Sequence, residues 1–159
     1  MQAHVQNIES LKLVGYKALL RSSPQEANNM AAIPSLWQKL MPLAQSLAPR
    51  KDLKRYAMIT GDLPEGKEQM AEYYALVAVE SFENIPEDLL RYEITHSKLA
   101  RCTHQGPPQT IGATAAKLIF EWLPTSGYSI SQNAELFIYP EGYDRNNPQG
   151  HFDYLLFVK

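Results

Sequence analysis

The stretch Ser35-Leu36-Trp37-Gln38-Lys39-Leu40-Met41-Pro42-Leu43-Ala44-Gln45-Ser46-Leu47 carries four leucines at the spacing i, i+4, i+7, i+11. This spacing puts the leucines on one stripe of an amphipathic helix, which Pro42 is expected to kink. A second stripe has the same spacing and consists of Ile111, Ala115, Leu118 and Trp122. Ile111 follows Leu36 by 75 residues (111 − 36). The sequence therefore predicts two equivalent helices.

Extended segments rich in apolar and aromatic residues surround each predicted helix. In the first half they are Ser10–Leu20, Arg55–Thr60 and Tyr73–Glu80; in the second half they are Arg91–Thr95, Leu99–Thr103, Tyr128–Ser131, Ala134–Tyr139 and Phe152–Val158. The first helix begins either at the capping box Ser23-Pro24-Gln25-Glu26 or after Ile33-Pro34, and Pro124 is expected to end the second. We predict one α+β domain over residues 1–159. It consists of two pseudo-symmetric βαββ units, about 1–84 and 85–159, which form an antiparallel sheet with two main helices and a ligand cleft between the halves.

Composition excludes several classes of protein. The net charge is -2 and basic residues are scattered, so no nucleic-acid-binding face is expected. The single cysteine, Cys102, rules out an internal disulfide framework. It shares a strand face with His104, which allows a nucleophile, although a half-buried structural thiol is the simpler reading. No apolar run is long enough to span a bilayer and no signal peptide is evident, so a cytoplasmic protein is expected. No metal-ligand spacing or cofactor fingerprint appears, so we predict no metal and no cofactor.

Glu135 is the most informative residue of the chain. It lies in the expected strand Asn133-Ala134-Glu135-Leu136-Phe137-Ile138-Tyr139, where alternation places Glu135, Phe137 and Tyr139 on one face. A carboxylate on an aromatic face is costly unless it is compensated. A cationic ligand or a role in proton transfer would compensate it. The other readings are a carboxylate that faces solvent on an edge strand and one that pairs with an arginine.

Aromatic residues are the other prominent chemical feature. Each one is individually more typical of a core than of a ligand site, but a cluster around a carboxylate would attract an organic cation. The ligand-binding residues predicted on this basis are Glu135, Phe137, Tyr139, Trp37, Trp122, Tyr74, Tyr56 and Tyr154. No catalytic residue is assigned.

Four segments resemble the GyrI-like, or AraC-type effector-binding, domain family. Ile33-Pro34-Ser35-Leu36-Trp37 resembles the start of the family's first helix, and Tyr73–Val79 resembles its central strand. Phe120–Tyr128 is similar to the Trp-Leu-Pro-x-Ser-Gly-Tyr end of its second helix. Ala134–Phe137 resembles its acidic-x-aromatic strand, in which tyrosine is commoner than the phenylalanine found here. The resemblance covers nearly the whole chain.

The resemblance implies two pseudo-symmetric units and a cleft in which a glutamate, matched here by Glu135, faces cationic, lipophilic or drug-like ligands. Phe137 lacks the hydroxyl of a tyrosine, which puts tyrosine-dependent catalysis at that position in doubt. In multidomain relatives the domain follows a DNA-binding segment, whereas this chain begins with the domain's first strand. We therefore expect a stand-alone binder of small organic ligands, cationic ones above all, related to bacterial transcription regulators.

Two alternatives stay open. Some relatives resemble hydrolases of reactive small molecules, in which the glutamate would act as general acid or base with the help of a cleft tyrosine. Others bind a topoisomerase, which implies a protein-interaction module of the gyrase-inhibitor type. A tyrosine hydroxyl or second carboxylate within reach of Glu135 would favour catalysis, and a purely aromatic surrounding would favour cation binding. We expect binding without chemistry.

Overall fold

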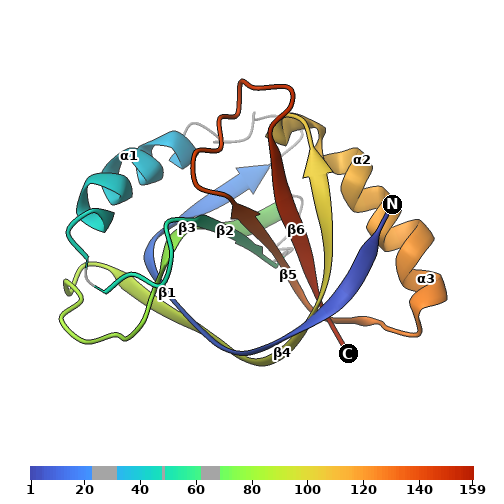
Figure 1. The fold of residues 1–159 in the computed structure, drawn as a ribbon, viewed down its shortest axis with the longest axis horizontal. Coiled ribbons are helices and arrows are strands. Elements are labelled where there is room, and N and C mark those ends of the chain that lie inside the picture. The colour runs from blue at the N-terminus through green and yellow to red at the C-terminus, as the bar shows by residue number, and fades with distance from the viewer. Residues whose placement is uncertain (23–31, 48, 62–68) are drawn as a thin grey trace.

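A computed structural model describes residues 1–22, 32–47, 49–61 and 69–159 of the chain (Figure 1). The elements follow the order β1 (Ala3–Ser22), α1 (Ala32–Ala44), β2 (Arg55–Thr60), β3 (Gln69–Val79), β4 (Leu90–Gln105), η1 (Pro108–Thr110), α2 (Ile111–Ala116), η2 (Lys117–Trp122), α3 (Leu123–Ser126), β5 (Ile130–Tyr139) and β6 (His151–Val158). The prediction of an α+β protein is confirmed. The capping box at residues 23–26 lies outside the described residues.

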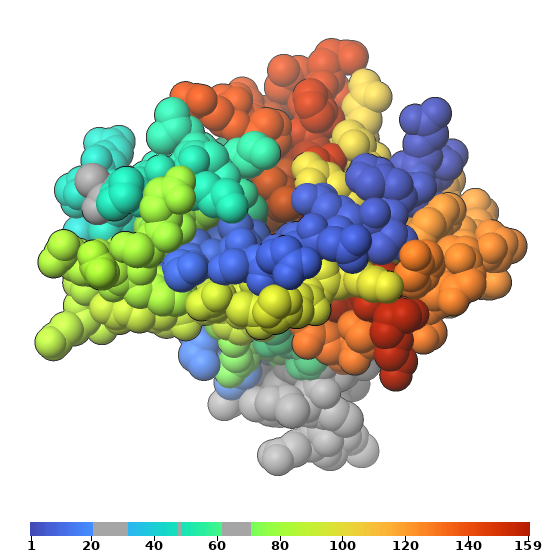
Figure 2. Space-filling model, turned by 60° about the horizontal axis from the view of Figure 1, so that its bottom comes forward, coloured from blue at the N-terminus to red at the C-terminus, as the bar shows by residue number. Residues whose placement is uncertain are grey.

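The described strands form one antiparallel sheet in the order β1-β3-β2-β5-β6-β4, which closes because β4 also pairs with β1. The predicted antiparallel sheet is therefore confirmed. Helix α1 and the helical segment α2–α3 lie on either side of the central strands, and the connection 140–150 passes between them (Figure 1). β1 and β4 run side by side across another face of the molecule (Figure 2).

The second helical segment does not end at Pro124, as predicted, but continues to Ser126. A proline lacks the N–H that an α-helical turn requires. Here a π-helical turn, η2, precedes it, and the N–H of Leu123 reaches back five residues to the carbonyl of Leu118. This wider turn changes the hydrogen-bond register just before the proline. Gly127, at φ +83°, then ends the helix in the left-handed conformation that glycine adopts easily.

Closure of the sheet makes the strands longer than predicted. β1 uses its N-terminal part to pair with β4 and its C-terminal part to pair with β3, and β4 joins the two extended segments that were predicted separately. β5 is likewise one strand from Ile130, but its register against β6 shifts between Ile130 and Glu135. This bulge adds residues to β5 immediately before Glu135, and bulges commonly redirect side chains at functional sites.

Alternation along the strands creates two main hydrophobic cores, and a small third cluster consists of Ala100, Leu123 and Val158. The inner core, enclosed by the strands, contains Leu13, Tyr56, Met58, Tyr74, Leu76, Leu99, Leu136 and Leu155 with their neighbours. The helix-side core lies between the sheet and the helices and contains Val14, Leu40, Ala57, Tyr73, Ala75, Leu118, Phe137, Phe152 and Tyr154 with their neighbours. The face of the sheet that carries the second core is called the helix-side face below. No helix of the described residues is both long and apolar enough to cross a membrane.

Candidate functional site

Glu135 lies on the helix-side face of β5. Leu136 and Ile138 point into the inner core, whereas Phe137 belongs to the helix-side core and Tyr139 packs against it. Glu135, Phe137 and Tyr139 therefore share one face, as strand geometry requires. Neighbouring strands place Ile59 of β2 and Leu156 of β6 beside Glu135.

The Glu135 carboxylate is partly buried and has one close polar neighbour. The Tyr154 hydroxyl donates a hydrogen bond to Glu135 Oε1 over 2.6 Å. No ion pair among the described residues includes Glu135, so the predicted alternative of an arginine partner is not seen there. A partly buried carboxylate with a neutral donor and no ion pair to a described residue has unused capacity for a positive ligand.

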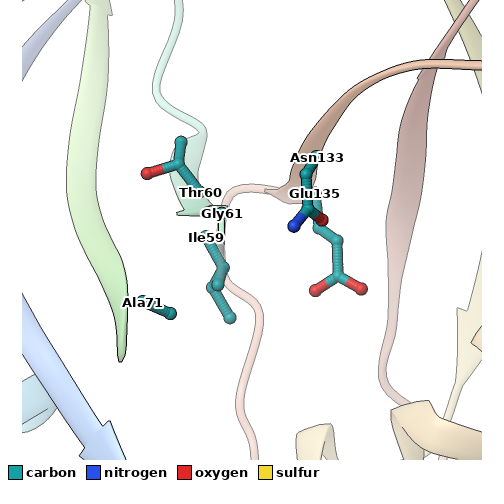
Figure 3. A pocket seen from close by; sticks show the side chains of 6 residues that line it. All are labelled: Ile59, Thr60, Gly61, Ala71, Asn133 and Glu135. Carbon is teal, nitrogen blue, oxygen red and sulfur yellow. The ribbon is translucent and has the colours of Figure 1, made fainter. Parts of the chain in front are cut away.

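A pocket of about 180 Å³ opens beside this carboxylate. It is lined by Ile59, Thr60, Gly61, Ala71, Asn133 and Glu135, and Figure 3 shows the Glu135 and Ile59 side chains extending to the same side of their strands. Drug-sized ligands usually occupy roughly 300–1,000 Å³. The pocket therefore has room for one charged group of a ligand, while the rest of such a molecule would lie outside it.

Tyr154 holds the Glu135 carboxylate in place through the hydrogen bond that it donates. Its side chain is fully buried, and burial together with the hydrogen bond to Glu135 raises the pKa of the hydroxyl above its ordinary value. The phenol stays protonated at neutral pH and keeps donating to Glu135 Oε1. Because the carboxylate is partly exposed and the phenol is not, a ligand meets Glu135 first.

The other predicted aromatic residues divide between the two faces of the sheet. Trp37 on α1 donates from Nε1 to the Tyr73 hydroxyl over 3.0 Å, and Trp122 packs partly buried against the helix-side core. Tyr56 and Tyr74 lie in the inner core, on the opposite face from Glu135. Their hydroxyls donate to Asp52 and Glu72 respectively. The structure thus does not bring Tyr56 and Tyr74 to the face that carries Glu135. Of the other predicted residues, Tyr154 contacts Glu135, whereas Phe137, Tyr139, Trp37 and Trp122 share its side of the sheet without lining the pocket.

Sequence reasoning missed most of the pocket lining. Ile59, Thr60, Gly61, Ala71 and Asn133 have no chemistry that marks them in the sequence. Asn133 was within reach of prediction, because it stands two residues before Glu135 in the same strand. The others follow from the register between β2, β3 and β5, which strand patterns alone do not give.

Cys102 and His104 are parts of the core. Burial raises the pKa of the Cys102 thiol to about 11, so the reactive thiolate is scarce at neutral pH. His104 is buried against Phe152, and its ring nitrogens lie 2.6 Å from Thr114 Oγ1 and 3.0 Å from the Pro107 carbonyl oxygen. These contacts connect β4 to the start of the second helical segment. This geometry supports the structural reading of Cys102.

Comparison with known proteins identifies the family. Residues 1–158 match the GyrI-like small molecule binding domain, and the chain belongs to this family. A search of curated proteins gives no match.

Solved structures share the fold at low identity. SAV2435 bound to tetraphenylphosphonium superposes with a TM-score of 0.72 and 16% identity, over 100% of this chain and 94% of that one. The EcmrR C-terminal domain gives 0.69 and 13%, over 99% and 97%. A hydrolase encoded by lin2189 from Listeria innocua gives 0.54 and 11%, over 99% and 92%. The chain is a small-molecule-binding domain by family, and these identities show the fold alone.

Proposed function

We propose that this protein binds lipophilic organic cations on its helix-side face, with Glu135 as the anionic anchor. The single observation that carries the proposal is a partly buried carboxylate that opens on a pocket and forms no ion pair with any described residue. A partly buried carboxylate is less well hydrated than a carboxylate in water. A bound cation stabilises it because the opposite charge replaces the hydration that burial removed.

Aromatic residues of the helix-side face suit the lipophilic part of a cation that extends beyond the pocket. Phe137 and Tyr139 share the face of Glu135, and Trp37 and Trp122 pack against the same core from the two helical segments, although none of the four lines the pocket itself. Aromatic faces attract organic cations by about 0.5–2 kcal/mol per good contact. The similar structure with tetraphenylphosphonium supports a ligand of this kind. We include Glu135, Phe137, Tyr139, Trp37, Trp122 and Tyr154 in the proposed site, with Tyr154 as the residue that positions the carboxylate.

The element order supports the pseudo-symmetric arrangement that we expected. Each half contributes a strand, a helical segment and two strands, and the order β1-β3-β2 of the first half is matched by β4-β6-β5 of the second. We propose that the two units are related in this way and that the ligand lies where β2 of one meets β5 of the other. We also propose that the protein is cytoplasmic and has no nucleic-acid affinity of its own.

A matched pair of ligands tests the charge preference. Methyltriphenylphosphonium is a cation, and triphenylphosphine oxide is a neutral molecule with the same three phenyl groups. Ligands that bind only the native state raise the melting temperature. We expect the cation to raise it in a dose-dependent way and the neutral molecule to have little effect. Equal shifts for the two compounds would contradict the role of charge.

Hydrolysis is a second candidate, because the Tyr154 hydroxyl lies 2.6 Å from Glu135 Oε1. A tyrosine hydroxyl within reach of this carboxylate is the feature expected to favour catalysis. However, Tyr154 is fully buried, so its hydroxyl reaches a substrate only through the carboxylate. The arrangement of Tyr154 and Glu135 therefore favours a binding site in which the tyrosine orients the carboxylate. Turnover of epoxides or activated esters that is lost in both Tyr154→Phe and Glu135→Gln would establish the hydrolase instead.

A further inference from the structure

Arg55 lies at the opposite end of the same strand pair as Glu135. On the helix-side face, β2 presents Arg55, Ala57 and Ile59, which pair in turn with Tyr139, Phe137 and Glu135 of β5. Ile59, the partner of Glu135, follows Arg55 by four positions, so the backbone positions of Arg55 and Glu135 lie about 13 Å apart along the strands. The face thus carries a cation at one end and an anion at the other.

Aromatic rings surround the Arg55 guanidinium. Its central carbon lies 5.9 Å from the ring centroid of Trp37 and 5.9 Å from that of Tyr139. Nη2 donates to the Tyr143 carbonyl over 2.8 Å. The ion pairs found in the described part of the chain do not include Arg55. The guanidinium is partly buried and retains donors for a planar anion.

A second donor at this end has no acceptor among the described residues. The Tyr143 hydroxyl is buried and makes no hydrogen bond to any described residue. Burial raises the pKa of Tyr143, and the nearby positive charges of Arg145 and Arg55 act in the opposite direction. Buried polar groups without partners are rare in folded proteins and usually have a reason. Here the phenol and the guanidinium offer hydrogen-bond donors in the same region.

Mostly buried side chains fill the face between the two charges. Ala57 and its β3 neighbour Ala75 are fully buried, so residues that project further cover the middle of the face. Phe137 and Tyr73, each 7% exposed, belong to this layer together with the partly buried Trp37. A ligand that reaches from the Glu135 pocket along the outer edge of this layer would place polar groups near both ends.

We propose that Arg55 is a specificity-determining residue that binds a carboxylate or sulfonate group of the ligand. The preferred ligands are then amphoteric: an aromatic or lipophilic body with a cationic group at Glu135 and an anionic group at Arg55. The inference rests on the proposed role of Glu135. Arginine suits this task because its planar fork matches the two oxygens of a carboxylate.

Two fluorescent dyes separate the contributions of the two ends. Rhodamine B carries a xanthylium cation and a carboxylate, and rhodamine B ethyl ester carries the same cation with the carboxylate blocked. Fluorescence anisotropy gives the Kd of each dye. A charge-assisted hydrogen bond corresponds to about tenfold or more in affinity. We therefore expect wild-type protein to bind the acid about tenfold more tightly than the ester.

Arg55→Gln should remove this preference. The acid should weaken by about tenfold while the ester keeps its Kd within about twofold, so that the two dyes bind alike. Arg55→Lys, which retains the charge, should keep part of the preference and covers the case in which the glutamine variant does not fold. Arg91→Gln is the matched control, since Arg91 is exposed and donates to two backbone carbonyls, those of Leu89 and Ile85. It should change neither Kd.

The outcomes distinguish the two proposals. Equal affinities of wild-type protein for acid and ester, or an Arg55→Gln variant that weakens both dyes equally, would overturn the role of Arg55 and assign it to holding the 140–150 connection. Glu135→Gln should weaken both dyes. If it leaves ester binding unchanged, or if neither dye binds, the proposed cation site itself fails.

Discussion

The Tyr154 hydroxyl donates to Glu135 Oε1 over 2.6 Å, diagonally across β6 and β5. The backbone partner of Tyr154 is Phe137, and that of Glu135 is Leu156, so the bond crosses from one residue pair to the next. The buried Tyr154 phenol fixes one oxygen of the Glu135 carboxylate, while the Glu135 side chain still lines the pocket. The carboxylate is therefore held in place before any ligand binds.

Tyr154→Phe should lower the free energy of unfolding by about 1.5–3 kcal/mol, because it removes a hydrogen bond to a charged group. Urea denaturation measures the change. Tyr74→Phe is a matched control, since Tyr74 donates to Glu72 at the same distance of 2.6 Å. Tyr74→Phe should lower the free energy of unfolding by less, because Glu72 keeps Lys17 at 3.4 Å as an ion-pair partner. Equal stability of Tyr154→Phe and wild type would show that the bond contributes nothing.

Gly15→Ala should be among the most damaging small substitutions. An added Cβ at Gly15 would lie 1.9 Å from the Ala75 carbonyl oxygen, which belongs to the backbone of the adjacent strand β3. Overpacking of this kind costs about 1–3 kcal/mol or more. Gly112→Ala is the control, because nothing lies within 4 Å of its added Cβ and alanine favours the helix by about 1 kcal/mol. Thermal melts that rank the two variants the other way would contradict the close approach of β1 and β3.

The two apolar stripes predicted the helices because their spacing follows the 3.6-residue period of a helix. Helix α1 forms although Pro42 lies within it. The end at Pro124 was predicted wrongly, because a local rule about proline cannot foresee a π turn that begins at Lys117. Strand lengths were underestimated for a related reason. β1 and β4 extend because each pairs with two neighbours, and such pairing depends on residues far away in the chain.

Alkaline pH should unfold the protein cooperatively. Burial is the main cause that raises the pKa of Tyr154, Tyr139, Tyr56 and Tyr73, and it raises that of Tyr74 to about 12. These groups bind protons more tightly when folded, so their stabilising contribution is full below the ordinary tyrosine pKa of about 10 and is lost as the pH rises above it. Absorbance of tyrosinate and circular dichroism should change together above pH 10. Ionisation of most tyrosines without loss of structure would be inconsistent with their burial.

Cys102 should resist thiol reagents in the native protein. Its side chain is 3% exposed, and burial raises its pKa to about 11. Reaction with a chromogenic disulfide at pH 8 should be slow until denaturant is added and should then be complete. Fast modification of the folded protein would mean that β4 opens readily near Cys102.

The candidate site was only partly accessible to sequence reasoning. Period-two alternation gave the shared face of Glu135, Phe137 and Tyr139, because that relation lies within one strand. Alternation within one strand does not indicate which face of another strand lies on the same side of the sheet. Tyr56 and Tyr74 were therefore predicted at the site although they lie in the inner core. Arg55 went unnoticed because its position opposite Tyr139 depends on the pairing of β2 with β5.

Glu135→Gln tests the central claim most directly. Isothermal titration of tetraphenylphosphonium into wild-type protein, Glu135→Gln and Glu72→Gln compares the loss of the site carboxylate with the loss of another carboxylate that accepts a tyrosine hydrogen bond. We expect Glu135→Gln to weaken binding by about 1–3 kcal/mol while the fold is retained, and Glu72→Gln to leave it unchanged. Equal affinities of wild type and Glu135→Gln would contradict the claim that Glu135 anchors a cation.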